Sequence, residues 1–364
     1  QTQLIETGEG STYSISAQDL AALEFNYRRD LNNDGIAGVR ILETPDKVGG
    51  LIKVKGADGD YYVSQSGAAA VNNLQNAFFD ESSNAWAPTK DAGTSISKLT
   101  LYQTINTDTD TEEFAIYQKQ VGANNVYSKY TFDENRHLTD KKQLTLVDLA
   151  NEESSSTRDI NGDGVIGAKV ISAIDKAGGV YKVSIENKFF MISIGPTASP
   201  GRQTGLSNVL MSEDSKPLEI DQTGLLVEGA LAGWKVNSAV LTTDSEGVST
   251  TKVFALKSNA GGYSDVKRLT FNGATDSIDY LNYKMLSAAE TLNAHDLVAE
   301  ETNQNYGRDF NADKAVGVKI AQTIDKKVGL YSTNVLGQNY YYKIAAIYTD
   351  MTQSCTTVCL SSYT

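Results

Sequence analysis

Arg29-Asp30-Leu31-Asn32-Asn33-Asp34-Gly35-Ile36-Ala37-Gly38 is the stretch that decides how this chain is built. The same order of Asp, Asn, Asp and Gly returns at 158–167, and it returns again at 308–317 with Lys314 in place of the first glycine. An Asp-Leu pair precedes each copy and an Asp-Lys pair follows it. Self-similarity of this kind is the signature of a repeat architecture. The sequence therefore predicts three related modules.

The acidic stretch has the chemistry of a calcium loop. Asp-x-Asn-x-Asp-Gly puts side-chain oxygens at loop positions 1, 3 and 5 and a main-chain carbonyl at position 7, while glycine at position 6 allows a positive φ. Asp, Asn and Gly also favour metal-free turns, but recurrence in one chain favours calcium over that alternative. The expected ligands are Asp30, Asn32, Asp34 and the Ile36 carbonyl in the first loop, Asp159, Asn161, Asp163 and the Val165 carbonyl in the second, and Asp309, Asn311 and Asp313 in the third.

The loops depart from an EF-hand at position 12, where a bidentate Glu would stand. The three copies carry Ile41, Val170 and Ile320 there. Glu24 and Glu153, on the segments before the first two loops, are the first candidates for the missing carboxylate, and Asp46 and Asp175 are the second. The alternatives are that the two Glu residues are solvated helix charges and that the two Asp residues are turn formers.

Two further features of the loops carry expectations. Lys314 brings a positive charge beside the third loop and puts a side chain where φ must be positive, so that loop should bind calcium weakly or not at all. The arginine that opens each copy is expected to be a local ion-pair partner; these residues are Arg29, Arg158 and Arg308.

The rest of the chain predicts a mainly β fold of tandem antiparallel β-sandwich or β-sheet modules joined by short helices and the acidic loops. Runs rich in aromatic and β-branched residues alternate with small polar turns, which is typical of hairpins. Helical periodicity is short, at 19–27, 148–154 and 296–303, and Asp19, Asp148 and Asp296 are expected N-caps. The expected domains are 1–18 as closing strands of an incomplete module, 19–147 as module 1, 148–295 as module 2 and 296–364 as an incomplete module 3.

These motifs, together with Trp86 and Trp234 among the strands, resemble the tryptophan-rich C-terminal repeat of secreted bacterial surface proteins. The acidic loop is the specific part of the match, and the likeness covers most of modules 1 and 2 and the start of module 3. The resemblance implies an extracellular calcium-binding repeat at the cell surface. It implies no enzymatic activity.

Composition narrows the choice of partners. The 364 residues carry a formal net charge of −13, which disfavours nucleic acid and attracts divalent cations. Two cysteines and two histidines do not make a usual four-ligand zinc site, and no apolar run is long enough for a membrane helix, so no membrane insertion is expected. Cys355 and Cys359 are expected to form a disulfide, with an intermolecular bond as the alternative.

The sequence favours a structural role over catalysis. His137 and His295 have no catalytic neighbourhood, and no nucleophile elbow, phosphate loop or dinucleotide motif is present. We expect a subunit of a surface layer, sheath or filament; an adhesin or glycan-binding module that uses aromatic runs such as 340–342 is the alternative, and a secreted hydrolase a distant third. Because the chain opens on strands that resemble a module's end, the segment 1–16 of one subunit is expected to complete the last module of the next, giving a head-to-tail homopolymer; pairing of the two ends within one chain is the alternative.

Overall fold

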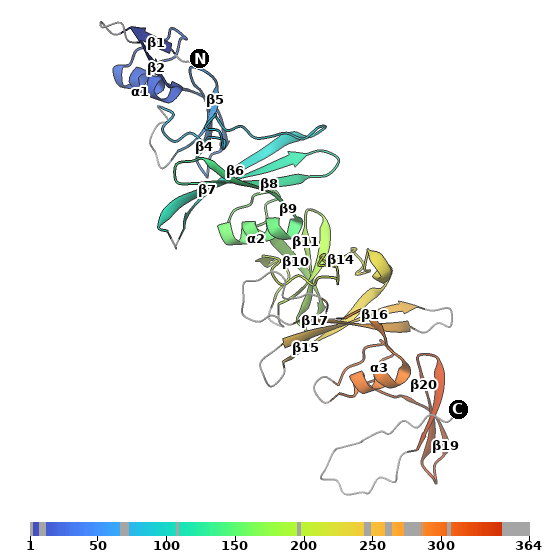
Figure 1. Cartoon of the computed structure of the whole chain (residues 1–364). Coiled ribbons are helices and arrows are strands. Elements are labelled where there is room, and N and C mark those ends of the chain that lie inside the picture. Colours follow the sequence, from blue (N-terminus) through green and yellow to red (C-terminus); the bar gives the residue numbers. More distant parts are fainter. Residues whose placement is uncertain are drawn as a thin grey trace. The chain divides into compact units, whose positions relative to one another are not determined.

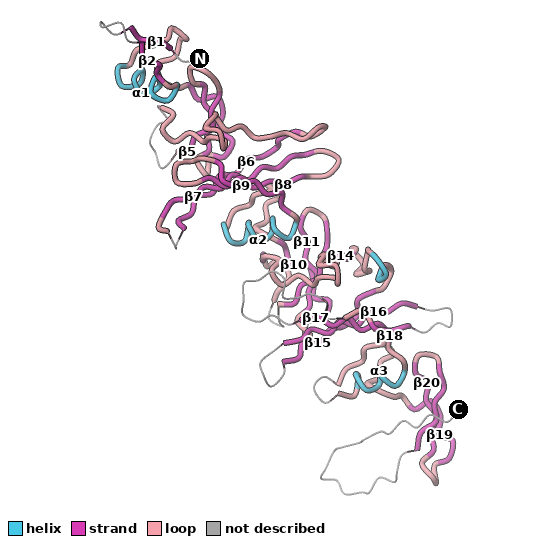
Figure 2. Tube along the Cα trace, viewed as in Figure 1, coloured by secondary structure: helices cyan, strands magenta, loops and turns pink. Residues whose placement is uncertain are grey.

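The computed structural model describes residues 3–6, 12–65, 73–106, 109–194, 198–243, 249–258, 264–272, 285, 287–303 and 307–343. The fold is mainly β, as predicted, with several small sheets whose paired strands are antiparallel and with short helices between them (Figures 1 and 2). The chain divides into two compact units, Gln1–Ile166 and Gly167–Thr364.

In the first unit a hairpin precedes a helix, and two sheets follow it. The hairpin is β1 (Gln3–Glu6) with β2 (Thr12–Ile15), and the helix is α1 (Ala17–Tyr27). The three-stranded sheet consists of β3 (Arg40–Asp46), β4 (Leu51–Lys55) and β5 (Asp60–Ser64). The four-stranded sheet consists of β6 (Ser95–Asn106), β7 (Thr111–Val121), β8 (Val126–Phe132) and β9 (Leu138–Leu144), and α2 (Leu146–Ser156) follows it.

The second unit repeats the succession of two sheets followed by a helix. Its first sheet is built on β10 (Ala168–Asp175), β11 (Val180–Ile185) and β12 (Lys188–Ser193), extended by β13 (Gln203–Thr204) and β14 (Glu219–Ile220). A 3-10 turn at Gly229–Leu231 leads to a four-stranded sheet of β15 (Lys235–Thr243), β16 (Ser249–Ser258), β17 (Ser264–Asn272) and β18 (Glu290–Thr291). Then come α3 (Ala294–Glu301) and a three-stranded sheet of β19 (Ile320–Asp325), β20 (Leu330–Val335) and β21 (Gln338–Lys343).

The observed N-caps of the helices lie three residues before the predicted ones. Ser16, Thr145 and Asn293 are the N-caps, and each side-chain oxygen accepts from the backbone N–H of the Asp three residues later. The prediction that Asp19, Asp148 and Asp296 cap the helices was therefore wrong. The Asp stands in the first turn instead, where its negative charge faces the positive end of the helix dipole.

The cap of α2 is a complete capping box. Thr145 accepts from the backbone N–H of Asp148, while the Asp148 carboxylate accepts from the Thr145 backbone N–H at 2.9 Å and from Lys142 Nζ at 2.9 Å. Burial raises the pKa of Asp148, but the hydrogen bonds from Lys142 and Thr145 outweigh burial and hold that pKa below its usual 3.8. The cap therefore stabilises α2 most when Asp148 is ionised.

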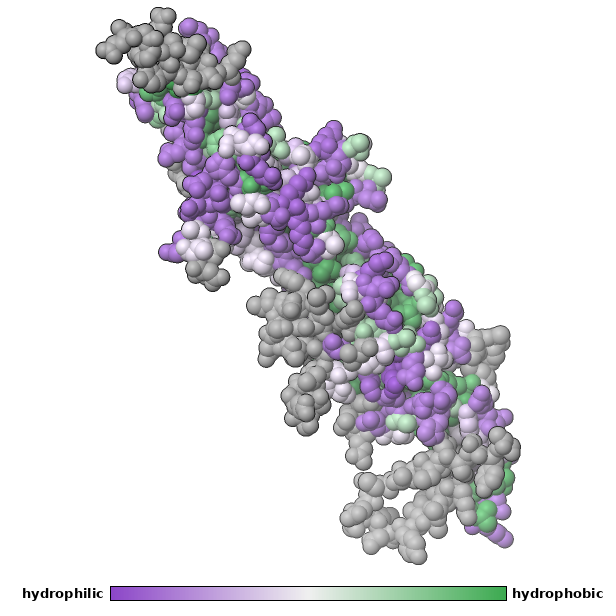
Figure 3. Space-filling model, viewed as in Figure 1, coloured by the Kyte–Doolittle hydropathy of each residue, from purple (hydrophilic) through white to green (hydrophobic). Residues whose placement is uncertain are grey.

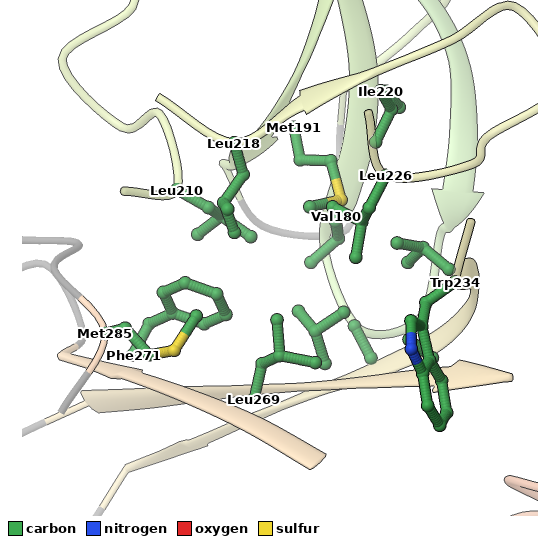
Figure 4. Packing of buried hydrophobic residues seen from close by; sticks show 14 residues of the cluster. Val180, Met191, Leu210, Leu218, Ile220, Leu226, Trp234, Leu269, Phe271 and Met285 are labelled. Carbon is green, nitrogen blue, oxygen red and sulfur yellow. The ribbon is translucent and has the colours of Figure 1, made fainter. Parts of the chain in front are cut away.

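In each unit one buried cluster lies between the first sheet, β3–β5 or the five-stranded sheet of β10–β12, and the four-stranded sheet that follows it. In the second unit, Val180 and Met191 of the first sheet face Leu269 and Phe271 of the next one (Figure 4). In the first unit the corresponding cluster joins β4, β5 and the residues after them to β6, β7 and β8; it contains Leu51, Tyr62, Phe78, Trp86, Leu99, Leu101, Phe114, Ile116, Tyr130 and Phe132. This face-to-face packing of two sheets is a β-sandwich arrangement.

A glycine lets the two sheets approach closely at one point. A side chain at Gly49 would collide with the Leu101 carbonyl of β6, and a side chain at Gly178 would collide with the Ala239 carbonyl of β15. Each glycine stands three residues after the recurrent Asp of the Asp-Lys pair, Asp46 or Asp175. The strand order thus brings the end of β3 or β10 against the first strand of the four-stranded sheet.

The compact units do not end where the sequence modules do. Glu152 of α2 accepts from Tyr117 Oη at 2.6 Å and pairs with Lys129 at 2.8 Å, so α2 belongs to the unit of β6–β9. A sequence module is therefore not the packing unit, because its helix and loop pack on the sheet that precedes them. None of the helices in the described ranges is long and apolar enough to cross a membrane. Cys355 and Cys359, with their expected disulfide, lie outside the described residues.

Candidate metal centre

The first acidic loop is a series of side-chain to backbone turns. Asp30 accepts from the backbone N–H of Asp34 at 3.1 Å and of Gly35 at 2.8 Å. Asn32 Oδ1 also accepts from the Asp34 N–H, and Asp34 Oδ1 accepts from the Ile36 N–H, each at 2.8 Å. Asp30, Asn32 and Asp34 are therefore held together on one turn of chain, with their oxygens oriented by the backbone.

The other two loops repeat these contacts. In the second loop Asp159 accepts from the Gly164 N–H and Asp163 accepts from the Val165 N–H. In the third loop the same bonds come from Lys314 and Ala315, and Asn161 and Asn311 repeat the contact of Asn32. The Asp, Asn and Asp side chains of the predicted sets thus lie on the same kind of hydrogen-bonded turn in all three loops, which have positive φ angles at the same loop positions.

A buried glutamate closes each loop from the inside. Glu24 Oε1 accepts from the N–H groups of Leu31 and Asn32, and Glu24 Oε2 accepts from that of Gly38. Glu153 accepts from the N–H groups of Ile160 and Asn161. These two residues are 1% and 0% exposed, which contradicts the alternative that they are solvated helix charges. Because their oxygens hold loop N–H groups, they have a structural part in the loop whether or not they also serve as cation ligands.

Glu301 is the third member of this set, and the sequence prediction missed it. It accepts from the N–H groups of Phe310, Asn311 and Gly317 and is 0% exposed. Glu301 lies eight residues before Asp309, whereas the first two copies have a spacing of six. The changed spacing hid the equivalence, although the Glu before each loop was a usable signal.

The third loop adopts the calcium-loop course despite its lysine. Lys314 has a φ of 69°, close to the 84° of Gly35 and Gly164. A non-glycine residue in this region costs on the order of 1 kcal/mol, so the loop carries strain that the other two avoid. The predicted positive φ at Lys314 is therefore confirmed. The weak calcium binding expected of this loop stays a prediction.

Negative charge in the third loop is poorly compensated. Asp309 Oδ1 is buried and has no hydrogen-bond partner within the described part of the chain. Burial raises the pKa of Glu301 to about 7. The backbone hydrogen bonds from Phe310 and Gly317 lower this pKa, and the charges of Asp313 and Asp309 add to the increase. A cation bound at this loop would satisfy the open oxygen and relieve the repulsion.

The second loop has lysines from the preceding sheet beside it. Lys98 of β6 donates to the Asp159 carbonyl at 2.5 Å, and its Nζ lies 3.9 Å from Asp159 Oδ1. Lys119 of β7 donates to the Asn161 carbonyl at 2.9 Å. These ammonium groups offset part of the negative charge of the loop and therefore oppose a bound cation.

The arginine that opens each loop copy does not form the expected local pair. Arg158 reaches back to Asp46 at 2.7 Å, and Arg308 reaches back to Asp175, residues 112 and 133 positions earlier. The prediction of local partners was wrong because β-sheet topology brings the end of one module against the loop of the next.

Each of these Asp residues is a meeting point for several donors. Asp46 also accepts from the N–H groups of Val48, Gly49 and Leu101, and Asp175 also accepts from those of Gly178 and Ala239. We call these two arrangements the Arg–Asp clamps. The carboxylates of Asp46 and Asp175 already accept from an arginine and from backbone N–H groups. Their assignment as second-choice cation ligands therefore does not fit their contacts.

The donor set of the loops suits a hard cation. Each loop offers two carboxylates, one amide oxygen and a main-chain carbonyl, which are ligands that Ca²⁺ accepts. Across the described residues no group of three His, Cys, Asp or Glu side chains has the arrangement of a metal site. Each loop therefore depends on amide and carbonyl oxygens to complete any shell, and the third loop in addition has the buried Asp309 Oδ1 without a hydrogen-bond partner in the described part of the chain.

The two histidines and the aromatic runs were the other residues considered for a function. His137 stacks on Phe79, with 5.4 Å between ring centroids, and its backbone N–H donates to Asp133. His295 is exposed beside Asp296 at the start of α3. Of the aromatic runs considered for glycan binding, Tyr61, Tyr62 and Phe190 are 7%, 8% and 5% exposed, Phe189 and Tyr340 are half-buried, and Tyr341 is 59% exposed.

Comparisons with known proteins do not assign the chain to a family. No model of a protein family matches the chain, and no curated protein matches it. The fission yeast SREBP–SCAP binding domains share 11% identity over 79% of this chain and 78% of that chain, with a TM-score of 0.17. An alpha-L-arabinofuranosidase of Podospora anserina shares 14% over 86% of each chain, with a TM-score of 0.15, and Drosophila Semaphorin 1a shares 10% over 97% and 88%, with a TM-score of 0.13. Scores this low carry no argument about fold or function.

Proposed function

We propose that this chain is a calcium-stabilised structural repeat protein of the bacterial cell exterior, a subunit of a surface layer, sheath or filament. One observation carries the proposal: three acidic loops have the same side-chain to backbone hydrogen bonds, and the third leaves a buried carboxylate oxygen without a partner. Calcium would supply positive charge at the point where each module meets the one before it.

The residues that would hold the ion are the predicted ones, Asp, Asn and Asp of each loop with the following main-chain carbonyl. The buried Glu of each loop positions this set by holding the loop N–H groups. The Arg–Asp clamps then tie the loop to the preceding module. Clamps that hold a loop to the sheets before it suit a structural role.

The adhesin or glycan-binding alternative has less support. Glycan sites need accessible aromatic faces, whereas the aromatic pair of β5 and Phe190 of β12 are core residues. The comparison to the tryptophan-rich surface repeat, an extracellular location and the absence of enzymatic activity remain parts of this proposal.

The experiment is thermal unfolding with calcium or with a chelator, combined with negative-stain microscopy. We expect calcium to raise the midpoint, because a ligand that binds the folded state alone stabilises it, and we expect ordered polymers in calcium. Unchanged melting on chelation would contradict the calcium assignment. Dispersed monomers that bind a glycan array would favour the adhesin.

A further inference from the structure

The sheet β19–β21 exposes positions that are buried in the other two modules. The three sheets share one hairpin register, with Ile52 opposite Val63, Tyr181 opposite Ile192 and Tyr331 opposite Tyr342. By this register Tyr341 corresponds to Tyr62 and Met191; Tyr341 is 59% exposed and the other two are 8% and 0%. Leu330 is half-buried, although its counterparts Leu51 and Val180 are fully buried.

We call this surface the open face and define it by Ile324, Leu330 and Tyr341, with Asp325 at its edge. Figure 4 shows what covers the same surface in the second module, where Val180 and Met191 point at Leu269 and Phe271 of the four-stranded sheet. In Figure 3 apolar residues, in green, reach the surface where Figure 1 labels β19. The open face is therefore a sheet surface built to pack on another β element.

The charges at the two ends of the series are complementary. Asp325 corresponds to the clamp residues Asp46 and Asp175, but it is exposed and accepts only from the N–H groups of Lys327 and Val328. Arg29 corresponds to Arg158 and Arg308, yet it is exposed and makes no ion pair within the described ranges. Each clamp joins an Asp to an arginine that lies further along the chain. Asp325 therefore offers the acceptor of such a clamp, and Arg29 offers the donor.

The loop surface beside Arg29 is open in the same way. Leu31 is 42% exposed, whereas Ile160 and Phe310 at the same loop position are 2% and 0% exposed. Phe310 stacks on Phe254 of the preceding four-stranded sheet with ring centroids 3.8 Å apart. The α1 end thus presents an apolar residue and an arginine that pack against a β-sheet in the other modules.

Val328 distinguishes which β element fits the open face. It stands where Gly49 and Gly178 let the first strand of a four-stranded sheet approach, and it is 53% exposed. A β-branched side chain there would block that first strand. The hairpin β1–β2 precedes α1 as β8–β9 precedes α2, so by position it corresponds to the last two strands of a four-stranded sheet.

We propose that the open face of β19–β21 binds the β1–β2 hairpin and α1 end of a second copy of this chain, with Asp325 paired to Arg29 of that copy. The inference rests on the proposed structural role and names the contact that would serve it. The contact joins two different surfaces, and such a contact builds an open series of subunits when its rotation does not close into a ring. Because a hairpin supplies two of the four strands found at the internal joints, the contact should be weaker than those joints and depend on protein concentration.

The test is a charge swap measured by sedimentation velocity over a concentration series of the full chain in calcium. Asp325→Arg and Arg29→Asp should each lower the association constant about tenfold, since like charges then face each other. The double variant should restore association to within about threefold of the wild type by the same charge argument. Asp140→Arg, at an exposed Asp of β9, is the matched control for the change in net charge and should have little effect.

Each other result overturns the contact. A chain that stays monomeric in calcium, a closed dimer in place of an open series, or single variants whose loss is not restored by the double variant would all do so. If polymers form equally well in both single variants, the structural role stands and the contact alone fails. If no polymers form while calcium still raises the melting midpoint, the assembly role fails together with the contact.

Discussion

Replacing Asp46 by Ala removes the acceptor of one Arg–Asp clamp. The Asp46 side chain is 9% exposed and takes donors from Arg158, Val48, Gly49 and Leu101. Breaking a buried ion pair costs about 3–5 kcal/mol, because the remaining charge stays buried without a partner. The Arg158 side chain is 22% exposed and can turn toward water, so we expect the low end, about 3 kcal/mol off the free energy of unfolding of the first unit.

The repeat supplies a matched control. Asp325 holds the same sequence position but is exposed and has no arginine partner in the described structure, so Asp325→Ala should cost less than about 0.5 kcal/mol. The assay is urea unfolding read by tryptophan fluorescence, because Trp86 lies in the core of the first unit and Trp234 in that of the second. With Trp234→Phe as background, Trp86 reports the first unit, which contains Asp46; with Trp86→Phe as background, Trp234 reports the second unit, which contains Asp325. Equal costs for Asp46→Ala and Asp325→Ala would refute the reasoning.

Four further changes test the loops and a cap. Lys98→Met should raise the calcium affinity of the second loop about threefold, because an opposing charge beside Asp159 is removed; calorimetric titration with unchanged affinity would show the lysine irrelevant. Lys314→Gly should add about 1 kcal/mol to the stability of the second unit by relieving a φ of 69°, and a melting midpoint that falls would contradict this. Thr145→Ala should cost about 1 kcal/mol. Asp148 adds stability above its usual pKa of 3.8 that is lost as the pH falls through its lowered folded value, so an Asp148→Ala penalty that persists in strong acid would argue against the capping box.

Local patterns predicted much of the fold and of the candidate site. Runs rich in aromatic and β-branched residues between small polar turns predicted the mainly β fold, because such residues favour strands and such turns join them. The three loops were found from spacing alone, since their ligand residues lie within six positions of one another. The helix caps were misplaced by three residues because Asp is favoured both at the N-cap and in the first turn.

The long-range contacts could not be predicted from the sequence. Asp46 and Arg158 are 112 positions apart, and nothing in either local pattern indicates that the end of β3 meets the next loop. Glu24 and Glu153 were predicted as candidates for the missing carboxylate, but their hydrogen bonds to the loop N–H groups were not predicted, because only the return of the loop over α1 or α2 forms them.

The lysines beside the second loop show the same limit. Lys98 and Lys119 lie on strands that face the loop only after β6–β9 pairs in its observed register. Their effect on cation affinity therefore comes from tertiary packing and not from the loop sequence. Two loops with the same motif can thus differ in affinity because their neighbours differ.

Calcium titration of the full chain by isothermal calorimetry is the most direct test of the calcium-stabilised repeat. The wild type should bind at the first and second loops, and Asp30→Ala and Asp159→Ala should each remove one site while leaving the other. Binding that neither variant changes, or no binding of calcium at all, would contradict the account.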